Sequence, residues 1–232
     1  MCGRFCIAAT PGEIRERYFL SSLPTLMLPS YNVAVTQTGL VITSSDRNRF
    51  FGKTARWGFK KEIQSQVKQI INLRSETIER TVHMINKDYT TRCLIPATGY
   101  YEWKREKNKK IPYYIRRNDN ALFSMAGLVS DASVGAAGSD PSFIILTCPS
   151  EGILSDVHDR MPVIITRDQE MQYLSSETKR AVPLSLPEIK TNIQEFTMFP
   201  VSPAVNNPEH NYPELIDPVT YPGSKQQRLW QV

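Results

Sequence analysis

The chain has 232 residues, 41% of them hydrophobic, and its 28 Lys and Arg against 23 Asp and Glu give a formal net charge of +5. This composition excludes an intrinsically disordered or collagen-like chain, and the length predicts a single sizeable core. Apolar runs such as residues 143–146 are far shorter than the roughly 20 residues of a membrane helix, and no secretory signal is visible, so we predict a cytoplasmic protein with no membrane partner.

The first half of the chain contains predicted helices and strands. The motif Thr10-Pro-Gly-Glu13 has the spacing of a capping box with proline at the first helical position, and it predicts a helix from residue 11 to about residue 20. Leu40–Ser44 and Phe50–Trp57 have the composition of strands, with a polar turn between them. Apolar residues at helical spacing then predict a helix from about Glu76 to Asn86.

Strand patterns dominate the second half. Small residues predict a flexible surface loop from Ser130 to Pro141, and the capping-box pattern Thr166-Arg-Asp-Gln169 predicts a short helix that ends at Leu174. The predicted strands are Leu94–Lys104, Pro112–Arg117, Ala121–Val129, Phe143–Cys148 and Pro162–Thr166.

The order of these elements predicts the fold class. Strands outnumber helices, and most are joined by loops of hairpin length. This is typical of an α+β protein, and we predict a mostly antiparallel, partly closed, β-barrel-like sheet with peripheral helices. Neither a repeat nor a linker divides the chain, so residues 1–219 are predicted to form one domain and residues 220–232 a flexible tail.

Cys2 is the first residue with distinctive chemistry. Aminopeptidases remove Met1 ahead of a small residue, and the product carries an α-amine and a thiol on adjacent carbons. The α-amine titrates at about 8 and a lysine at about 10.4, so far more of the α-amine is neutral at pH 7. Such an aminothiol condenses with an aldehyde to an imine, and the thiol then closes a thiazolidine ring. The alternatives are an amide-cleaving nucleophile and a buried, inert cysteine.

The remaining cysteines and the basic residues have plainer interpretations. The four cysteines have no CxxC spacing, so we predict free thiols and no metal or other cofactor. Cys6, Cys93 and Cys148 lie in apolar stretches and are interpreted as packed thiols. The basic run from Lys104 to Lys110 separates two predicted strands, and we interpret it as a solvated hairpin loop in preference to a nucleic-acid contact.

Ten sequence blocks share their order and spacing with one family. From Cys2 to about Val219 the chain resembles the SOS-response-associated peptidase family, the abasic-site-processing proteins that crosslink to single-stranded DNA. The resemblance implies a monomeric DNA-damage enzyme that acts on abasic sites in single-stranded DNA, with replication or repair proteins as further partners. The blocks are Met1-Cys-Gly-Arg-Phe5, Tyr31-Asn-Val-Ala34, Trp57-Gly58, Ile71-Asn-Leu-Arg-Ser-Glu-Thr77, Arg92-Cys-Leu-Ile-Pro-Ala-Thr-Gly-Tyr-Tyr-Glu-Trp-Lys104, Pro112-Tyr113, Met125-Ala-Gly-Leu128, Ile144-Ile-Leu-Thr147, Val157-His-Asp-Arg-Met-Pro162 and Val201-Ser-Pro-Ala-Val205.

The resemblance also implies roles for individual residues. Cys2 matches the nucleophile that attacks the C1′ aldehyde, and Asn72 matches the asparagine that positions the amine and the sugar. Glu102 matches a proton-shuttling glutamate, and His158 matches the histidine that assists sugar ring opening and stabilises or reverses the Schiff base. Arginines in the DNA-binding set are expected to hold phosphates and to lower the pKa of the thiol. The implied DNA-binding residues are Gly3, Arg4, Asn32, Arg74, Trp103, Thr147 and Arg160.

Other interpretations stay open at this point. Glu102 alternates with two aromatic residues, as on the solvent face of a strand, and His158 lies in a turn between charged neighbours. Abasic lyase activity, crosslink reversal and self-processing peptidase activity are further activities of the same site. The alternatives to a crosslinking enzyme are a noncatalytic single-strand-binding module, a cysteine peptidase acting on other proteins, and a thiol-based oxidation sensor.

The chain departs from the family pattern at two places. Val35 stands where the family commonly has proline, so we expect a less rigid loop there. After Trp57-Gly58 the family shows a proline and an aromatic residue, whereas Phe59-Lys-Lys-Glu-Ile63 follows here. We expect Lys60 and Lys61 to replace stacking on that side of the lesion with charge.

Overall fold

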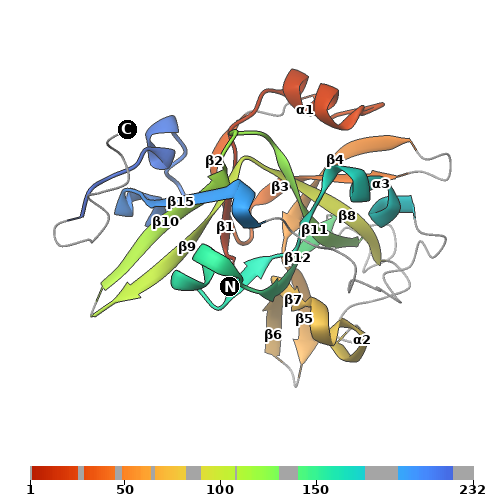
Figure 1. Ribbon diagram of the computed structural model, residues 1–232. Coiled ribbons are helices and arrows are strands. Elements are labelled where there is room, and N and C mark those ends of the chain that lie inside the picture. The colour runs from red at the N-terminus through yellow and green to blue at the C-terminus, as the bar shows by residue number, and fades with distance from the viewer. Residues whose placement is uncertain are drawn as a thin grey trace.

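Strands dominate the computed structural model (Figure 1). It describes residues 2–25, 29–44, 49–63, 66–81, 90–107, 109–130, 141–175 and 193–221. Every helix in these ranges is too short or too polar to span a bilayer. The strands are β1 (Arg4–Ile7), β2 (Ser30–Ala34), β3 (Thr38–Ser44), β4 (Phe50–Trp57), β5 (Phe59–Ile63), β6 (Gln66–Ile70), β7 (Asn72–Arg74), β8 (Thr90–Ala97), β9 (Gly99–Glu106), β10 (Lys109–Arg117), β11 (Phe123–Ser130), β12 (Ser142–Pro149), β13 (Arg160–Pro162), β14 (Ile164–Ile165) and β15 (Phe196–Pro200).

The larger sheet closes on itself. β12 pairs with β11 through Ile145 and Gly127, and with β4 through Phe143 and Trp57, so the strand path β12-β4-β3-β8-β11 returns to β12. β7 and β13 attach to β12, and β14 attaches to β11. Most pairings are antiparallel, whereas β12 runs parallel to β4 and β7. The prediction of a mostly antiparallel, partly closed sheet is confirmed.

The smaller sheet has the order β15-β10-β9-β1-β2 and contains the start of the chain. The sequence predicts a single strand over Leu94–Lys104, and this is wrong, because the chain forms β8 in the larger sheet and β9 in the smaller one. The chain passes between the sheets at Thr98, whose hydroxyl accepts a hydrogen bond from the Ala8 N–H at 2.9 Å. The next residue is Gly99, where the ring of Tyr114 leaves no room for a Cβ. Apolar composition continues through this turn and conceals the break.

The two sheets share one hydrophobic core. Phe5 of the smaller sheet packs edge-on against Trp57 and Phe143 of the larger sheet, with ring centroids 5.3 and 6.4 Å apart. The indole and the second phenyl ring stack at 5.9 Å. All three rings are fully buried. This packing fixes β1, and with it the first residues of the chain, against the larger sheet.

The helices lie at the periphery of the sheets, as predicted (Figure 1). The first of them, α1 (Pro11–Tyr18), begins with the predicted capping box: Glu13 N–H donates to Thr10 Oγ1 at 3.3 Å, and Thr10 N–H donates to the Glu13 carboxylate at 2.7 Å. It ends at Tyr18, because Phe19 adopts a left-handed conformation with a φ of 50°.

The sequence predicts two further helices, and the described residues contain at least part of each. A 3₁₀ turn, η1 (Ser75–Thr77), precedes α2 (Ile78–Thr81), and residues 82–86 of the predicted helix lie outside the described residues. The predicted last helix is confirmed as α3 (Arg167–Ser175). The remaining described 3₁₀ turns are η5 (Gly152–Asp156), η6 (Ile193–Glu195), η7 (Pro203–Asn206) and η8 (Pro213–Ile216).

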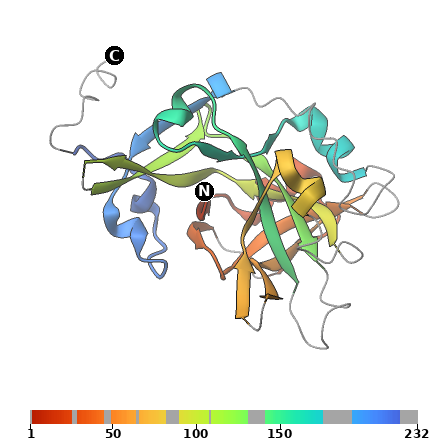
Figure 2. The same cartoon turned by 90° about the horizontal axis from the view of Figure 1, so that it is seen from below.

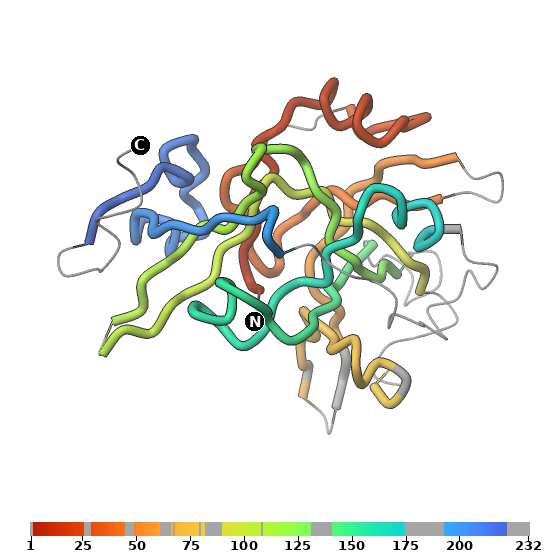
Figure 3. Tube along the Cα trace, viewed as in Figure 1, coloured from red at the N-terminus to blue at the C-terminus, as the bar shows by residue number. Residues whose placement is uncertain are grey.

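Several short strands escape the sequence patterns, namely β1, β2, β5, β6, β7 and β15. Among them, β5 and β6 form a separate two-stranded hairpin that projects from the body of the molecule (Figures 2 and 3). The predicted strand Pro162–Thr166 is divided instead between β13 and β14, on either side of Val163. Residues 131–140 of the predicted loop and residues 222–232 of the predicted tail lie outside the described residues.

Candidate active site

Cys2 lies where the two sheets meet. Gly3 alone separates it from the smaller sheet's β1, and Asn72 in β7 of the larger sheet donates a hydrogen bond from Nδ2 to the Cys2 carbonyl at 2.8 Å. Phe5 pairs with Tyr100 in antiparallel register. The same register, continued toward Cys2, places Glu102 opposite Gly3. The Cys2 side chain is fully buried. Elements of both sheets therefore surround the start of the chain.

Asn72 is positioned by β7, a three-residue strand that runs parallel to β12 and pairs there with Ile145. Its Nδ2 donates to the Cys2 carbonyl, whereas its Oδ1 is buried and accepts no hydrogen bond from any described residue. A buried acceptor without a donor is energetically costly. An amide oxygen next to Cys2 is suited to orient an amine or a sugar hydroxyl.

Two buried acids determine the electrostatics at this point. Burial raises the pKa of the Glu102 carboxyl to about 7. Burial, followed by the negative charge of Glu102, raises the pKa of the Cys2 thiol well above its usual value. The expectation that arginines lower the thiol pKa is therefore wrong: the pKa is raised, and desolvation by burial is the largest cause. At pH 7 the thiol keeps its proton, while Glu102 is able to give and take one.

His158 lies between η5 and β13. The backbone N–H of Arg160 donates to His158 Nδ1 at 3.0 Å, so the neutral ring holds its proton on Nε2. Burial lowers the pKa of His158 below its usual value, which keeps the ring neutral at pH 7. Asp159 Oδ1 lies 2.8 Å from the same Nδ1, a contact that becomes an ion pair only when the ring is protonated.

A pocket of about 460 Å³ opens beside these groups. Its volume is sufficient for a sugar and an adjoining phosphate. The described lining residues include two predicted catalytic residues and one predicted DNA-binding residue. Cys2 is not among them. The lining residues are Glu102, Trp103, Arg105, Lys110, His158 and Asn206.

Arg4, Asn32 and Trp103 anchor the segment that follows β15. Arg4 Nη1 donates to Asn32 Oδ1 at 2.8 Å and to the Val205 carbonyl at 2.6 Å, and its guanidinium lies 6.0 Å from the centre of the Trp103 ring. Trp103 Nε1 donates to Asn206 Oδ1 at 2.8 Å. Asn32 is only 2% exposed, and its amide also bonds to backbone carbonyls of that segment. Asn32 thus shapes the pocket wall without facing the solvent.

Thr147 and Arg160 are also engaged within the protein. Arg160 forms a bidentate ion pair with Glu76, and its Nη2 donates to the Thr147 carbonyl at 2.7 Å. Its side chain is 7% exposed, so this guanidinium is bonded within the protein, and its phosphate contact stays a prediction. Thr147 is fully buried and donates to the Leu73 carbonyl. Among the predicted DNA-binding residues, Arg74 is exposed.

The other residues near the start of the chain add little chemistry of their own. Gly3 is half-buried between Cys2 and β1. All four cysteines are without disulfides, and burial raises the pKa of Cys6 and of Cys148 to about 11. Within the described ranges, no three His, Cys, Asp or Glu side chains gather in a way that could hold a metal ion.

The whole of this site lies in a stretch that matches a known family. The model of the SOS response associated peptidase (SRAP) family matches residues 1–208, which include every residue named for this site. The chain belongs to the SRAP family. The resemblance seen in the sequence is thereby confirmed.

Relatives of this SRAP protein cover nearly its whole length. The abasic site processing protein YoaM of Bacillus subtilis is 33% identical over 94% of this chain and 98% of that protein. The abasic site processing protein YedK of Escherichia coli is 28% identical over 94% of this chain and 100% of that protein. A crystal structure of a protein from Bacteroides thetaiotaomicron, 23% identical, has a TM-score of 0.73 over 94% of this chain and 100% of that chain, and it shows the same fold.

The SRAP site contains residues that the sequence reasoning did not select. Asn206 fixes the Trp103 indole, Glu76 fixes Arg160, and Arg105 and Lys110 line the pocket. Glu76 lies within the quoted block around Asn72, so that block offered a signal for it. Arg105 and Lys110 belong to a run interpreted as solvated, and Asn206 follows the last block without any signal of its own.

Proposed function

We propose that this SRAP protein crosslinks covalently, through Cys2, to abasic sites in single-stranded DNA. The observation that carries the proposal is the burial of Cys2 beside Glu102, with Asn72 bonded to the Cys2 carbonyl. An amine, a thiol and a proton-exchanging carboxyl are then held together, which removes the entropic cost of assembling them. The names of the relatives, abasic site processing proteins, support the same substrate.

The proposed reaction begins at the amine. Removal of Met1 frees the α-amine of Cys2, which adds to the C1′ aldehyde of the ring-opened abasic sugar and gives a carbinolamine. Glu102 in its protonated form gives its proton to the departing hydroxyl, and water leaves as the imine forms. His158, with its proton on Nε2, assists the preceding ring opening by proton transfer to the sugar ring oxygen.

Ring closure completes the crosslink. Cys2 Sγ attacks the imine carbon and a C–S bond forms, while the C=N electron pair moves to the nitrogen. The thiol proton passes through the Glu102 carboxylate to that nitrogen, and the product is a thiazolidine. Because burial keeps the thiol protonated, the amine reacts first and the thiol second. The sum is protein plus DNA minus one water, and the chain's own groups suffice without a cofactor.

The imine has other fates in the same site. Elimination of the 3′ phosphate gives abasic lyase activity, and addition of water reverses the crosslink. Self-removal of Met1 would use the Cys2 thiol as a peptidase nucleophile. The net charge of +5 supports association with DNA phosphates.

The test is the intact mass of the protein after incubation with a single-stranded oligonucleotide that carries one abasic site. We expect loss of Met1 and a heat-stable adduct of protein plus oligonucleotide minus water, with no adduct on the same oligonucleotide without the lesion. Cys2→Ala, which keeps the α-amine, should form only an imine that requires borohydride for trapping. A stable adduct in Cys2→Ala would refute the thiazolidine.

Two other outcomes would select the alternative functions. A mature Cys2 that binds intact and abasic strands equally, with no adduct, identifies a noncatalytic single-strand-binding module. Turnover of peptides in the absence of DNA identifies a cysteine peptidase that acts on other proteins.

A further inference from the structure

The β9–β10 hairpin presents two cations side by side. Arg105 and Lys110 lie directly opposite each other in the antiparallel register, and both are exposed. Like charges in such a pair repel each other and destabilise a hairpin. Within the described part of the chain, neither residue forms an ion pair with a carboxylate, whereas Glu106 of the same hairpin forms one with Lys104. An anion from outside the protein would relieve this repulsion.

These two cations belong to the pocket. Arg105 and Lys110 line it together with Trp103 and the catalytic candidates Glu102 and His158. The pocket's cationic wall thus stands next to the groups proposed to act on the abasic sugar. A phosphodiester is the anion that accompanies a sugar in nucleic acid.

The other arginines near the pocket are already engaged. The Arg4 guanidinium is bonded to Asn32 and to a backbone carbonyl, and that of Arg160 is ion-paired with Glu76. Of these four cationic side chains, only Arg105 and Lys110 are available to a ligand without breaking an ion pair or hydrogen bond among the described residues. A guanidinium fork and an ammonium group on one face suit the oxygens of a single phosphate.

We propose that Arg105 and Lys110 form a phosphate-binding pair that holds one phosphodiester of the DNA strand next to the abasic nucleotide. This inference rests on the proposed function for its ligand. The start of the chain and the projecting β9–β10 hairpin are seen together in Figure 2. A phosphate held by this pair would fix the lesion relative to Glu102 and His158, so the pair acts in binding and positioning.

The first test compares the variant Arg105→Gln/Lys110→Gln with Lys109→Gln. Lys109 is exposed on the same hairpin, lies opposite Glu106 and does not line the pocket, so it is a control for the loss of a hairpin charge outside the pocket. The measurement is the affinity for an intact single-stranded oligonucleotide over a series of salt concentrations. We expect the double variant to bind roughly 10-fold more weakly at 0.1 M salt, with a log–log salt slope smaller by about 0.7, the value for one lost phosphate contact. Lys109→Gln should stay within about 2-fold of the wild type.

The second test locates the phosphate. Single methylphosphonates, which are neutral, replace each phosphate around the abasic site in turn. One position should weaken binding by the wild type and leave binding by the double variant unchanged, because the pair is already absent there. Equal sensitivity of both proteins at every position would overturn the inference, as would an unchanged salt slope in the double variant.

The outcomes separate this inference from the proposed function. If the wild type crosslinks and the double variant binds DNA as tightly as Lys109→Gln, only the phosphate pair is overturned. A wild type that forms no adduct, combined with a coupled phosphate position on intact DNA, overturns the crosslinking proposal and keeps the pair. A wild type that binds no oligonucleotide overturns both.

Discussion

Glu102 and Cys2 are two acids whose protonated forms are favoured by burial. The pKa of Glu102 is raised to about 7, while that of the thiol is raised well above its usual value. A thiol in this state does not compete with the amine for the aldehyde, and it depends on a neighbouring base to lose its proton. Glu102 is suited to serve as the acid in imine formation and the base in ring closure.

The pH dependence of imine formation should report on Glu102. In the wild type, imine formation needs a neutral α-amine, which forms as the pH rises through about 8. It also needs a protonated Glu102, which is lost as the pH rises through about 7. The product of these two fractions gives a bell-shaped rate profile. Glu102→Gln should be roughly 100-fold slower and should lose the fall at high pH. The measurement is a single-turnover rate with borohydride quenching. Glu106→Gln, on the same strand, is the control, and a bell-shaped profile in Glu102→Gln would contradict the assignment.

The same residue should make folding stability depend on pH. The folded-state pKa of Glu102 is raised from 4.5 to about 7, so the stability it contributes is present below pH 4.5 and is lost as the pH rises through 7. Glu102→Gln stays neutral throughout. We therefore expect this variant to be more stable than the wild type at pH 8, by an amount on the order of 2 kcal/mol, and equally stable at pH 4. Urea unfolding at both pH values tests this, and a pH-independent difference would count against it.

At the scale of elements, η1 and β13 are joined by a network that orients His158. The Arg160 guanidinium is held by Glu76 of η1 and by the Thr147 carbonyl of β12, while the backbone N–H of Arg160 bonds to His158 Nδ1. The bonds to the Arg160 guanidinium thus fix the Arg160 backbone, whose N–H orients the His158 imidazole and determines its tautomer. We interpret Arg160 as a positioning residue.

Removal of the Glu76 carboxylate should disturb both stability and the histidine. Glu76→Gln leaves the buried Arg160 without its counter-ion, and because Glu76 is 40% exposed we expect a loss of about 1–2 kcal/mol. Arg160 lowers the pKa of Glu76 to about 2. The stability that the ion pair contributes is therefore fully present above the usual pKa of a carboxyl group, and it is lost as the pH falls through 2. The midpoint of the His158 titration, followed by NMR, should also move. Glu151→Gln, exposed at the start of η5, is the control, and an unmoved midpoint would remove the positioning role.

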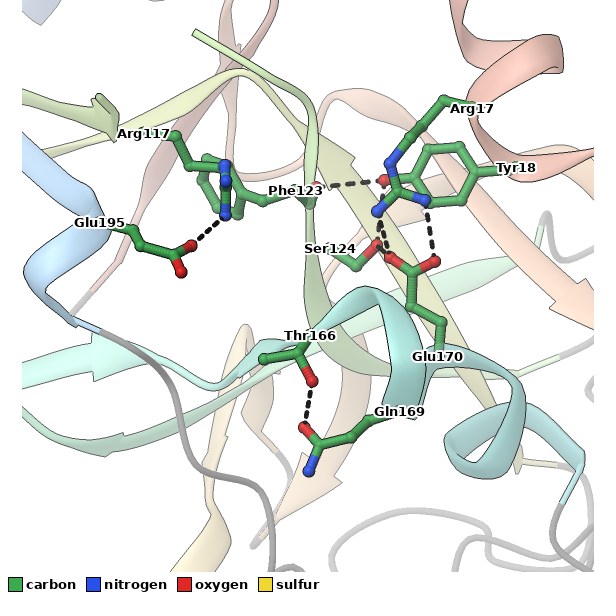
Figure 4. Close-up of polar contacts among 9 residues, drawn as sticks. All are labelled: Arg17, Tyr18, Arg117, Phe123, Ser124, Thr166, Gln169, Glu170 and Glu195. Atoms are coloured by element: carbon green, nitrogen blue, oxygen red, sulfur yellow. Dashed lines mark hydrogen bonds and ion pairs between the residues drawn. The ribbon is translucent and has the colours of Figure 1, made fainter. Parts of the chain in front are cut away.

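A second network ties α1 to α3 away from the site (Figure 4). Arg17 donates twice to the Glu170 carboxylate, at 2.7 and 3.0 Å, and Ser124 Oγ donates to the same carboxylate at 2.6 Å. Tyr18 extends the network to β11 through Ser124. Glu170 is 4% exposed, so its charge depends on these partners.

Breaking this second network should cost stability without affecting chemistry. Glu170→Gln leaves Arg17 without its carboxylate, and we expect a loss of about 2–4 kcal/mol. The crosslinking rate below the unfolding temperature should equal that of the wild type. Glu16→Gln, exposed on α1, removes the same charge as a control. Thermal unfolding and the adduct assay measure the two effects, and a slower adduct in a folded Glu170→Gln would show that the network reaches the site.

At the scale of the whole molecule, the two sheets are one packing unit. Phe5 of β1 is enclosed by Trp57 and Phe143 of the larger sheet. Asn72 of the larger sheet also bonds to Cys2 beside the smaller one. Loss of either sheet would expose the core face of the other and separate the proposed catalytic residues.

We therefore expect one cooperative unfolding transition. In differential scanning calorimetry the calorimetric and van't Hoff enthalpies should agree. The loss of Trp fluorescence should coincide with the heat peak. Two resolved transitions would mean that the sheets unfold separately, and the prediction that residues 1–219 form one domain would be wrong.

The sequence alone determined the family and the fold class, and it predicted the residues of the site. Cys2 stood out because its position implies an aminothiol, and the quoted blocks led to Asn72, Glu102 and His158. Local patterns also predicted α1, because Thr10 and Glu13 interact over a single turn. These features depend on residue type or on contacts between near neighbours, which a linear pattern retains.

Only the tertiary structure decided which side chains face a ligand and how they titrate. Arg4, Arg160, Arg105 and Lys110 are all basic residues in the sequence, yet the first two are bonded within the protein and the last two line the pocket. The raised pKa of Glu102 comes from burial by strands remote in sequence. Burial and pairing depend on which distant segments pack together, and the sequence pattern around each residue does not contain that information.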